Sequence, residues 1–232
     1  YLRNSVFPII IGGDHSISIG SVSGTKMAFP DKRLGVIWID AHADLHTPWT
    51  TPSGNVHGMP LALLMQIEKK GKNNPLVYTM DIWDRLRKIG VNGPKMQPSD
   101  LVIIALRDYE PEERAIIEEH GIKVITVAEL RKVGAKAVVQ ETLAHLTLCD
   151  KIHVSFDVDC LDPSISIGTG TPVPDGLMAN EASELLQGFC KDPKTVTLDV
   201  VEINPALGQA NDMAEATLGI LEPLFPILRT RP

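Results

Sequence analysis

Hydrophobic positions along the chain fall into short apolar runs that alternate with longer amphipathic stretches. Runs such as "LGVIWI" are apolar at successive positions, which is typical of strands covered on both faces of a sheet. The pattern predicts strands at residues 7–11, 34–39, 101–105, 123–125, 152–156 and 196–201. It predicts helices at residues 16–29, 58–70, 111–120, 127–148, 179–191 and 214–224.

This regular exchange of strand and helix predicts an α/β fold with a central, mostly parallel sheet. We find no internal repeat, low-complexity tract or linker, so we expect a single domain over residues 1–232. Ligands bind at the carboxyl ends of the strands in sheets of this kind. The residues that follow each predicted strand are therefore the first candidates for function.

Composition narrows the functional classes. Hydrophobic residues make up 44% and charged residues 22% of the 232 residues, as in most globular proteins. The net charge of −7 argues against a nucleic-acid surface, which needs a basic stripe. The longest apolar runs are shorter than the roughly 18–20 residues of a membrane helix. Three cysteines without a CxxC pair favour a reducing compartment, and we expect the cytoplasm.

Acidic and histidine residues follow three of the predicted strands. The motif "DAHAD" comes directly after "LGVIWI", and its alternate residues point to one side of an extended backbone. The motif "SFDVDCLDP" ends the fifth strand in the same way, and "GGDHS" follows the first strand after a glycine pair that permits a tight turn. The residues singled out are His15, Asp40, His42, Asp44, Asp157 and Asp159.

Four carboxylates at the rim of a buried sheet repel one another and take up protons unless cations are present. Six oxygen and nitrogen ligands are too many for one ion but suit two ions that share carboxylates. The absence of thiolate ligands favours Mn²⁺ over Zn²⁺. Each motif alone also fits a helix cap, a turn or a packing histidine. Their occurrence at three strand ends favours the metal site.

Several motifs together resemble the ureohydrolases, and within them the arginase family. They are "GGDHS", "DAHAD", "TPSGNVHG", "SFDVDCLDP", "GTGTPVPDGL" and "VVEINP", in order from residue 12 to about residue 205. The resemblance implies a three-layer α/β/α fold and two Mn²⁺ per chain. It also implies hydrolysis of the guanidinium group of L-arginine to L-ornithine and urea by a metal-bridging hydroxide.

The resemblance has consequences for the whole protein too. It implies a homo-oligomer, a trimer or a hexamer. It implies the cytoplasm or, alternatively, the mitochondrial matrix. The first strand and helix of the family have no counterpart in the chain, which begins at Tyr1, so we expect them to precede it in the complete protein.

Roles for individual residues follow from the resemblance. One ion is expected to bind His15, Asp40, Asp44 and Asp157, and the other Asp40, His42, Asp157 and Asp159, so that Asp40 and Asp157 bridge. The expected catalytic residues are His57, Glu202 and Asp44. A carboxylate such as Glu202 can hold a guanidinium by two hydrogen bonds, and a histidine such as His57 can carry a proton to the leaving amine. A structural ion pair is the alternative for Glu202.

The substrate's amino-acid end is expected at a second group of residues. Thr51, Ser53 and Asn55 resemble residues that bind an α-carboxylate, and Glu110 and Glu113 resemble acids near the α-ammonium group. Thr171 resembles a hydroxyl that lines the site. His46 stands where animal arginases have an asparagine, and Glu110 is one methylene longer than the family's aspartate. Without the resemblance, these residues would pass for a polar loop, a turn and the acidic first turn of a helix.

Two other functions stay open on the sequence. A related ureohydrolase would act on agmatine, guanidinobutyrate or formiminoglutamate. Agmatine has no carboxylate, so the polar loop at residues 46–57 favours L-arginine over it. A metal-binding but inactive regulatory or scaffold protein is the alternative of another class, against which the complete set of ligands, His57 and Glu202 argue.

Overall fold

The computed structural model describes residues 1–4, 6–208 and 211–231. In these residues six strands form one sheet, with the order β1-β6-β5-β2-β3-β4 and every neighbouring pair parallel. The predicted α/β fold with a parallel sheet is confirmed. The strands are β1 (Ile9–Ile11), β2 (Leu34–Ile39), β3 (Leu101–Ile104), β4 (Lys123–Ile125), β5 (Lys151–Asp157) and β6 (Thr195–Val201).

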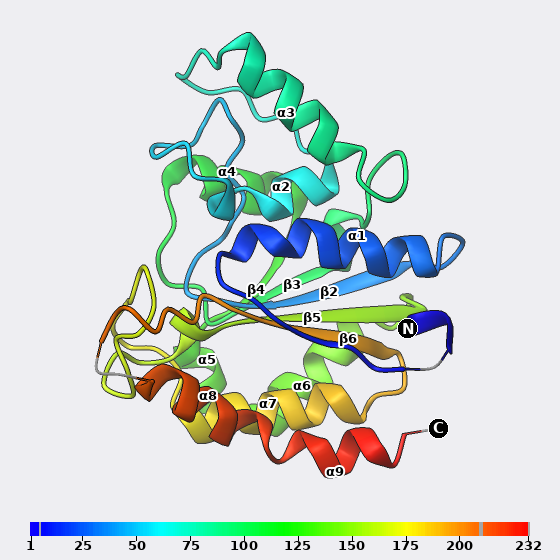
Figure 1. The fold of residues 1–232 in the computed structure, drawn as a ribbon, viewed down its shortest axis with the longest axis vertical. Helices are drawn as coiled ribbons and strands as arrows, with labels where there is room; N and C mark the ends of the chain where they lie inside the picture. Colours follow the sequence, from blue (N-terminus) through cyan, green and yellow to red (C-terminus); the bar gives the residue numbers. More distant parts are fainter. Residues whose placement is uncertain (5, 209–210, 232) are drawn as a thin grey trace.

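Helices cover both faces of the sheet, which gives three layers (Figure 1). One layer contains α1 (Ser18–Ala28), α2 (Pro60–Met65), α3 (Val77–Arg87) and α4 (Pro111–His120). The other contains α5 (Val127–Val133), α6 (Ala135–His145), α7 (Ala179–Lys191), α8 (Asp212–Leu221) and α9 (Leu224–Arg229). None of the helices among the described residues has the length and apolar character needed to cross a membrane.

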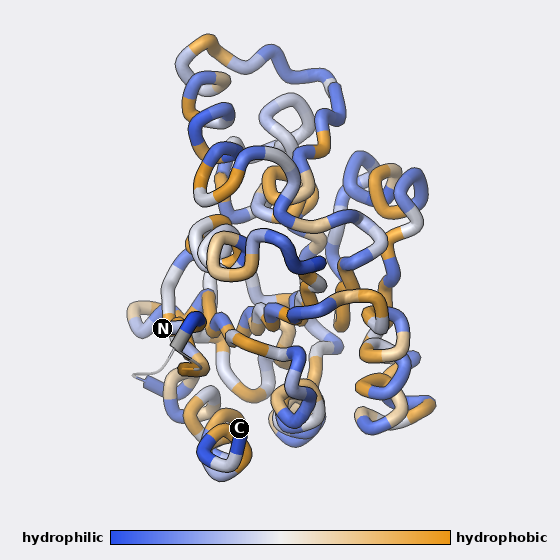
Figure 2. The backbone as a smooth tube through the Cα atoms, turned by 90° about the vertical axis from the view of Figure 1, so that its right-hand side faces the viewer, coloured by the Kyte–Doolittle hydropathy of each residue, from blue (hydrophilic) through white to orange (hydrophobic). Residues whose placement is uncertain are grey.

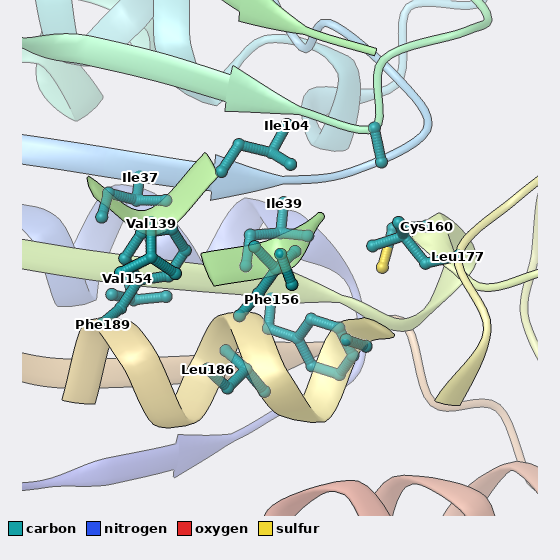
Figure 3. Close-up of a cluster of buried hydrophobic side chains, with 14 of the residues drawn as sticks. Ile37, Ile39, Ile104, Val139, Val154, Phe156, Cys160, Leu177, Leu186 and Phe189 are labelled. Atoms are coloured by element: carbon teal, nitrogen blue, oxygen red, sulfur yellow. The ribbon is translucent and has the colours of Figure 1, made fainter. Parts of the chain in front are cut away.

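Each face of the sheet has its own hydrophobic core because side chains alternate along a strand. On β2, Ile37 and Ile39 point to the layer of α5–α9, while Val36 and Trp38 point to the other layer. Figure 3 shows Ile37 and Ile39 beside Val154 and Phe156 of β5, above Leu186 and Phe189 of α7. The helices carry hydrophobic and hydrophilic positions in alternation, so each can meet both core and solvent (Figure 2).

Several helices differ from the expectation, and α9 (Leu224–Arg229) is one that was not predicted. The helix predicted at 127–148 is divided at Gly134, whose φ of 86° no other residue type adopts easily. The helix predicted at 58–70 is much shorter, because α2 ends where Gln66 takes a left-handed conformation. The helix α3 was not predicted, and it lies farthest from the sheet in its layer (Figure 1).

The register of the strands brings distant segments together at the carboxyl edge. Ile39 of β2 pairs with Phe156 of β5, which in turn pairs with Val200 of β6. The next residues, Asp40 and Asp157, therefore leave the sheet side by side, and Glu202 follows β6 nearby. The polar residues predicted from three separate motifs thus share one edge of the sheet.

Candidate metal centre

His15 lies at the centre of a first group of ligands. It begins a short 3₁₀ turn (His15–Ile17) after β1, and the Asp14 carboxylate caps this turn by accepting the Ser16 N–H. His15 Nδ1 lies 3.2 Å from Asp40 Oδ2, 3.2 Å from Asp44 Oδ2 and 2.9 Å from Asp157 Oδ2. The four side chains are buried.

His42 lies at the centre of a second group. Its Nδ1 is 2.9 Å from Asp159 Oδ2 and 3.4 Å from Asp40 Oδ1. Asp40 therefore gives one carboxylate oxygen to each group. Asp157 contacts His15 through Oδ2, whereas its Oδ1 accepts the Asp159 N–H at 2.8 Å.

The two groups hold more negative charge than a buried site tolerates. Burial raises the pKa of Asp44 and of Asp157 well above the ordinary value, and neighbouring carboxylates raise it further. Burial lowers the pKa of His42, but hydrogen bonds and charge from Asp159 and Asp40 outweigh it and raise this pKa to about 12. The cluster therefore requires bound positive charge, either protons or cations.

The donor set fits divalent cations. His15 Nδ1 and Asp44 Oδ2 are buried and have no hydrogen-bond partner among the described residues, although other atoms of the cluster have one. An ion with ligands at about 2.1 Å and at right angles places neighbouring ligand atoms about 3 Å apart. The distances around His15 Nδ1 match this spacing. A proton would satisfy one of these atoms, whereas a cation satisfies all of them.

Further residues orient these ligands, and the sequence did not reveal them. The Trp38 indole N–H donates to Asp40 Oδ2 at 2.9 Å, and its ring stacks on His15 at 4.1 Å between centroids. Ser155 Oγ lies 2.8 Å from His15 Nε2. Trp38 stands two residues before Asp40 and Ser155 two before Asp157, so strand alternation could have found both.

A cavity of about 130 Å³ opens over the two groups. His57, in a 3₁₀ turn (Val56–Gly58), and Glu202, after β6, line it together with Asp44. His57 Nδ1 is 3.8 Å from Glu202 Oε1, and the same oxygen accepts the backbone N–H of His15 at 2.6 Å. The nearby Glu202 carboxylate raises the pKa of His57 above its ordinary value, although partial burial opposes this.

The loop at residues 46–57 reaches the cavity only in part. Thr51 and Ser53 line it, as does Thr171, whose hydroxyl donates to Asp159 Oδ2 at 3.2 Å. Thr51 Oγ1 accepts the Gly54 N–H at 3.0 Å, which holds the turn of the loop. Asn55 is exposed and outside the lining, and its backbone N–H donates to Ser53 Oγ.

His46, Glu110 and Glu113 form one cluster in the lining of the cavity. His46 Nε2 lies 3.0 Å from Glu110 Oε2, and its Nδ1 lies 3.1 Å from Thr50 Oγ1. Both ring nitrogens are thus engaged within the protein. The Glu113 carboxylate accepts the backbone N–H groups of Leu45 and Glu110. Burial and the nearby Glu110 raise the pKa of Glu113 to about 8.

Paired carboxylate–imidazole groups at the carboxyl edge of a parallel sheet define an α/β protein with a candidate metal-ion site at the usual ligand-binding edge. The chain belongs to the arginase family, whose sequence model matches residues 1–225. It is 40% identical over 225 residues to an arginase of Bacillus subtilis, covering 97% of this chain and 70% of the relative. It is 41% identical to human arginase-1 over 218 residues, with 93% and 64% covered.

Solved structures agree with this assignment. The arginase of Bacillus caldovelox superposes with a TM-score of 0.84 at 36% identity, covering 97% of this chain and 70% of that chain. A formimidoylglutamase of Bacillus subtilis has a TM-score of 0.78 at 22% identity, which is a likeness of fold alone. The predicted family is confirmed.

Proposed function

We propose that this protein hydrolyses the guanidinium group of L-arginine to L-ornithine and urea with two bound Mn²⁺. The observation that supports this most is Asp40, which offers one oxygen to the His15 group and the other to the His42 group. A carboxylate in this position can bridge two ions. The arginases among its relatives have 36–41% sequence identity to the chain.

The residues of the two groups would hold the ions. We assign His15, Asp40, Asp44 and Asp157 to one ion, and Asp40, His42, Asp157 and Asp159 to the other. Oxygen-rich ligands without thiolate suit Mn²⁺. When bound, such ions supply the positive charge that the carboxylates require, and they lower the pKa of a coordinated water to about 7.

Glu202 is proposed to bind the substrate guanidinium. The backbone N–H of His15 donates to one Glu202 carboxylate oxygen, so the Glu202 side chain has a defined position near the ligand groups. Its side chain is only 14% exposed, which strengthens its attraction for a cation. A planar guanidinium held by two hydrogen bonds presents its carbon at a fixed distance and angle to the ligand groups below.

His57 is proposed to deliver a proton to the leaving amine. Its contact with Glu202 raises its pKa, so the imidazole holds a proton closer to neutral pH than a free histidine does. Its side chain is 31% exposed, so it can exchange that proton with solvent after each turnover. Asp44, with a buried and unpaired oxygen in the lining, is proposed to serve both as ligand and as a catalytic carboxylate.

The amino-acid end of the substrate is proposed to lie between residues 51–55 of the loop and the cluster of His46, Glu110 and Glu113. Thr51, Ser53 and Asn55 would offer hydrogen bonds to the α-carboxylate, with Asn55 reaching in from the mouth of the cavity. The Glu110 carboxylate would attract the α-ammonium group, Glu113 would accept a hydrogen bond from it, and Thr171 lines the space between. Because both nitrogens of His46 are engaged, His46 would act on the substrate through Glu110.

An assay of urea release from L-arginine and from agmatine, with and without Mn²⁺, tests the function. We expect manganese-dependent release from L-arginine and little from agmatine. Ser53→Ala should raise KM for L-arginine, because a donor to the carboxylate is lost. Val56→Ala, in the same loop but without a polar side chain, is the control. Equal activity on agmatine would favour a related ureohydrolase, and tight manganese binding without urea release would favour an inactive protein.

The wider setting is part of the proposal. Cys149, Cys160 and Cys190 are buried and free, in keeping with a reducing compartment such as the cytoplasm. A homo-oligomer, either a trimer or a hexamer, is proposed from family membership. Sedimentation of the purified protein would measure its mass in solution.

A further inference from the structure

A buried carboxylate behind the metal centre has no part in the proposed chemistry. Asp199, on β6, is fully buried and lies between the sheet and α1. Its Oδ2 accepts hydrogen bonds from Ser18 Oγ at 2.9 Å, from Ser21 Oγ, and from His153 Nε2 at 2.9 Å. Its Oδ1 is buried without a hydrogen-bond partner among the described residues.

Asp199 is ionised in this setting. Burial raises its pKa, but the charge and hydrogen bond of His153, together with the two serine hydroxyls, outweigh burial and lower it. Thr25 Oγ1 donates to the Ser21 carbonyl, so it can only accept from His153 Nδ1. Both ring nitrogens of His153 therefore face acceptors, Asp199 at Nε2 and Thr25 at Nδ1.

A line of three contacts connects Asp199 to His15. Ser18 Oγ lies 3.4 Å from Ser155 Oγ, which is the longest of the three, and Ser155 Oγ lies 2.8 Å from His15 Nε2. Ser18 has a single hydroxyl proton and gives it to the Asp199 carboxylate. It can therefore only accept from Ser155.

Ser155 has one proton and two neighbouring acceptors, Ser18 Oγ and His15 Nε2. When that proton is directed to Ser18, Ser155 offers a lone pair to His15 Nε2. His15 must then carry its proton on Nε2, and its Nδ1 keeps the lone pair that faces Asp40, Asp44 and Asp157. In the opposite tautomer the proton on Nδ1 would occupy the position where a cation binds.

We propose that Asp199 is a positioning residue that acts through Ser18 and Ser155 to hold His15 in the tautomer that binds a metal ion. The inference rests on the proposed metal centre. An ionised carboxylate with one unpaired oxygen in a fully buried site is a poor way to gain stability, since well-packed apolar residues do as well or better. Control of the His15 tautomer explains the presence of the Asp199 carboxylate, because hydrogen-bond partners behind ligating histidines set the tautomer and basicity of the imidazole.

Two serines on α1 provide a matched test. Ser18→Ala breaks the line to His15, whereas Ser21→Ala removes another donor to the same Asp199 oxygen without touching that line. The affinity of the metal-free protein for Mn²⁺ is measured by competition with a chelator. We expect Ser18→Ala to lower it about tenfold and Ser21→Ala to change it by less than about twofold.

The ¹⁵N resonances of His15 in the metal-free protein give a direct second readout. We expect the Nε2–H tautomer in the wild type and in Ser21→Ala, and a loss of that preference in Ser18→Ala. Asp199→Asn should change the His15 tautomer and the Mn²⁺ affinity in the same direction as Ser18→Ala. If the Asp199→Asn protein does not fold, the comparison of Ser18→Ala with Ser21→Ala decides. Equal affinities for the two serine variants, or an unchanged tautomer in Ser18→Ala, would overturn the proposal.

Urea release by the wild type is measured separately. Tight manganese binding without urea release would refute the proposed activity and leave the positioning role to be decided by the serine variants. A wild type that hydrolyses L-arginine, together with a Ser18→Ala variant of unchanged Mn²⁺ affinity, would refute only the positioning role.

Discussion

At the scale of single residues, Asp40 is the position on which both ligand groups depend. Asp40→Ala removes one ligand atom from each group, so we expect the purified protein to retain almost no Mn²⁺. Asp159→Ala removes a contact of the His42 group only, and it should leave one ion bound. Elemental analysis after dialysis measures both. An Asp40→Ala protein that retains one Mn²⁺ per chain would contradict the bridging assignment.

His57 is expected to affect turnover and leave metal binding unchanged. Among the described residues His57 lies near Glu202 and lines the cavity, and no ion pair joins it to a proposed metal ligand. Loss of a general acid slows a reaction by about 10²–10⁴-fold, so His57→Ala should lower kcat in this range while the Mn²⁺ content stays at the wild-type value. Steady-state kinetics measures kcat, and elemental analysis of the same preparation measures the Mn²⁺ content. Loss of manganese in this variant would refute the role as a proton donor.

Glu113 should make the stability of the protein depend on pH. Its pKa of about 8, against an ordinary value of 4.5, means that the folded protein holds a proton that the unfolded chain has lost. Stability is therefore lost as the pH rises through this interval. Glu113→Gln should match the wild type at about pH 5 and exceed it at about pH 9 by on the order of 2–4 kcal/mol.

Denaturant unfolding at several pH values measures this difference. The control is Glu112→Gln, a half-buried residue of the same helix, for which we expect no such trend. A stability difference that is constant with pH would show that Glu113 is ionised in the folded protein throughout.

The candidate ligands could be predicted because their positions follow from local rules. A strand that ends in alternating acids and histidines places them on one side, and parallel strands bring their carboxyl ends together. The backbone strain at the site could not be predicted. Asp44, Ala105 and Glu202 have positive φ angles of 52°, 73° and 63°, which only the packing around them imposes.

At the scale of elements, the strands were predicted well and the helices less so. Strands covered on both faces have apolar runs that no other element of this length imitates. The helix α3 escaped prediction because Trp83 is its only fully buried residue, so it lacks a strong apolar stripe. The division of α5 and α6 depends on the conformation of Gly134, and a glycine within a helical pattern is also compatible with an unbroken helix.

The packing of α7 against α6 depends on a residue without a side chain. A Cβ at Gly188 would lie 2.6 Å from a methyl carbon of Val139, too close for either helix to stay in place. Gly188→Ala should destabilise the protein by about 1–3 kcal/mol. Gly20→Ala in α1, where a Cβ has no neighbour within 4 Å, should stabilise it by about 0.5–1 kcal/mol.

Urea unfolding of the two glycine variants provides the comparison. Both replace a helical glycine by alanine and so change helix propensity equally, which leaves the contact with Val139 as the difference between them. A stability gain in Gly188→Ala would mean that α6 and α7 separate more easily than their close approach indicates.

At the scale of the whole molecule, the metal centre connects segments that are far apart in sequence. Its proposed ligands follow β1, β2 and β5, which lie at different positions in the sheet (Figure 1). Ions bound there would join these segments to one another, in addition to the hydrophobic cores on both faces. Stability and metal content should therefore be coupled across the molecule.

That coupling predicts how the unfolding temperature responds to manganese and to pH. An ion at 100 times its dissociation constant stabilises the folded state by about 2.7 kcal/mol per site, which corresponds to about 5–10 °C for a chain of this size. In the metal-free protein, Asp44 and Asp157 have raised pKa values, so its stability falls as they lose protons with rising pH. The metal-bound protein uses the same carboxylates as deprotonated ligands. The unfolded chain has also lost these protons, so the stability of the metal-bound protein does not fall over that interval.

The difference in unfolding temperature between protein with Mn²⁺ and protein with a chelator should therefore widen as the pH increases from about 5.5 to about 8.5. Differential scanning calorimetry measures it, and Asp40→Ala, which lacks the proposed bridge, should show almost no difference at any pH. A difference that narrows with rising pH would mean that the cluster releases no protons on binding cations. Because bound cations and bound protons would then occupy separate places, the carboxylates around His15 and His42 could not be the ligands.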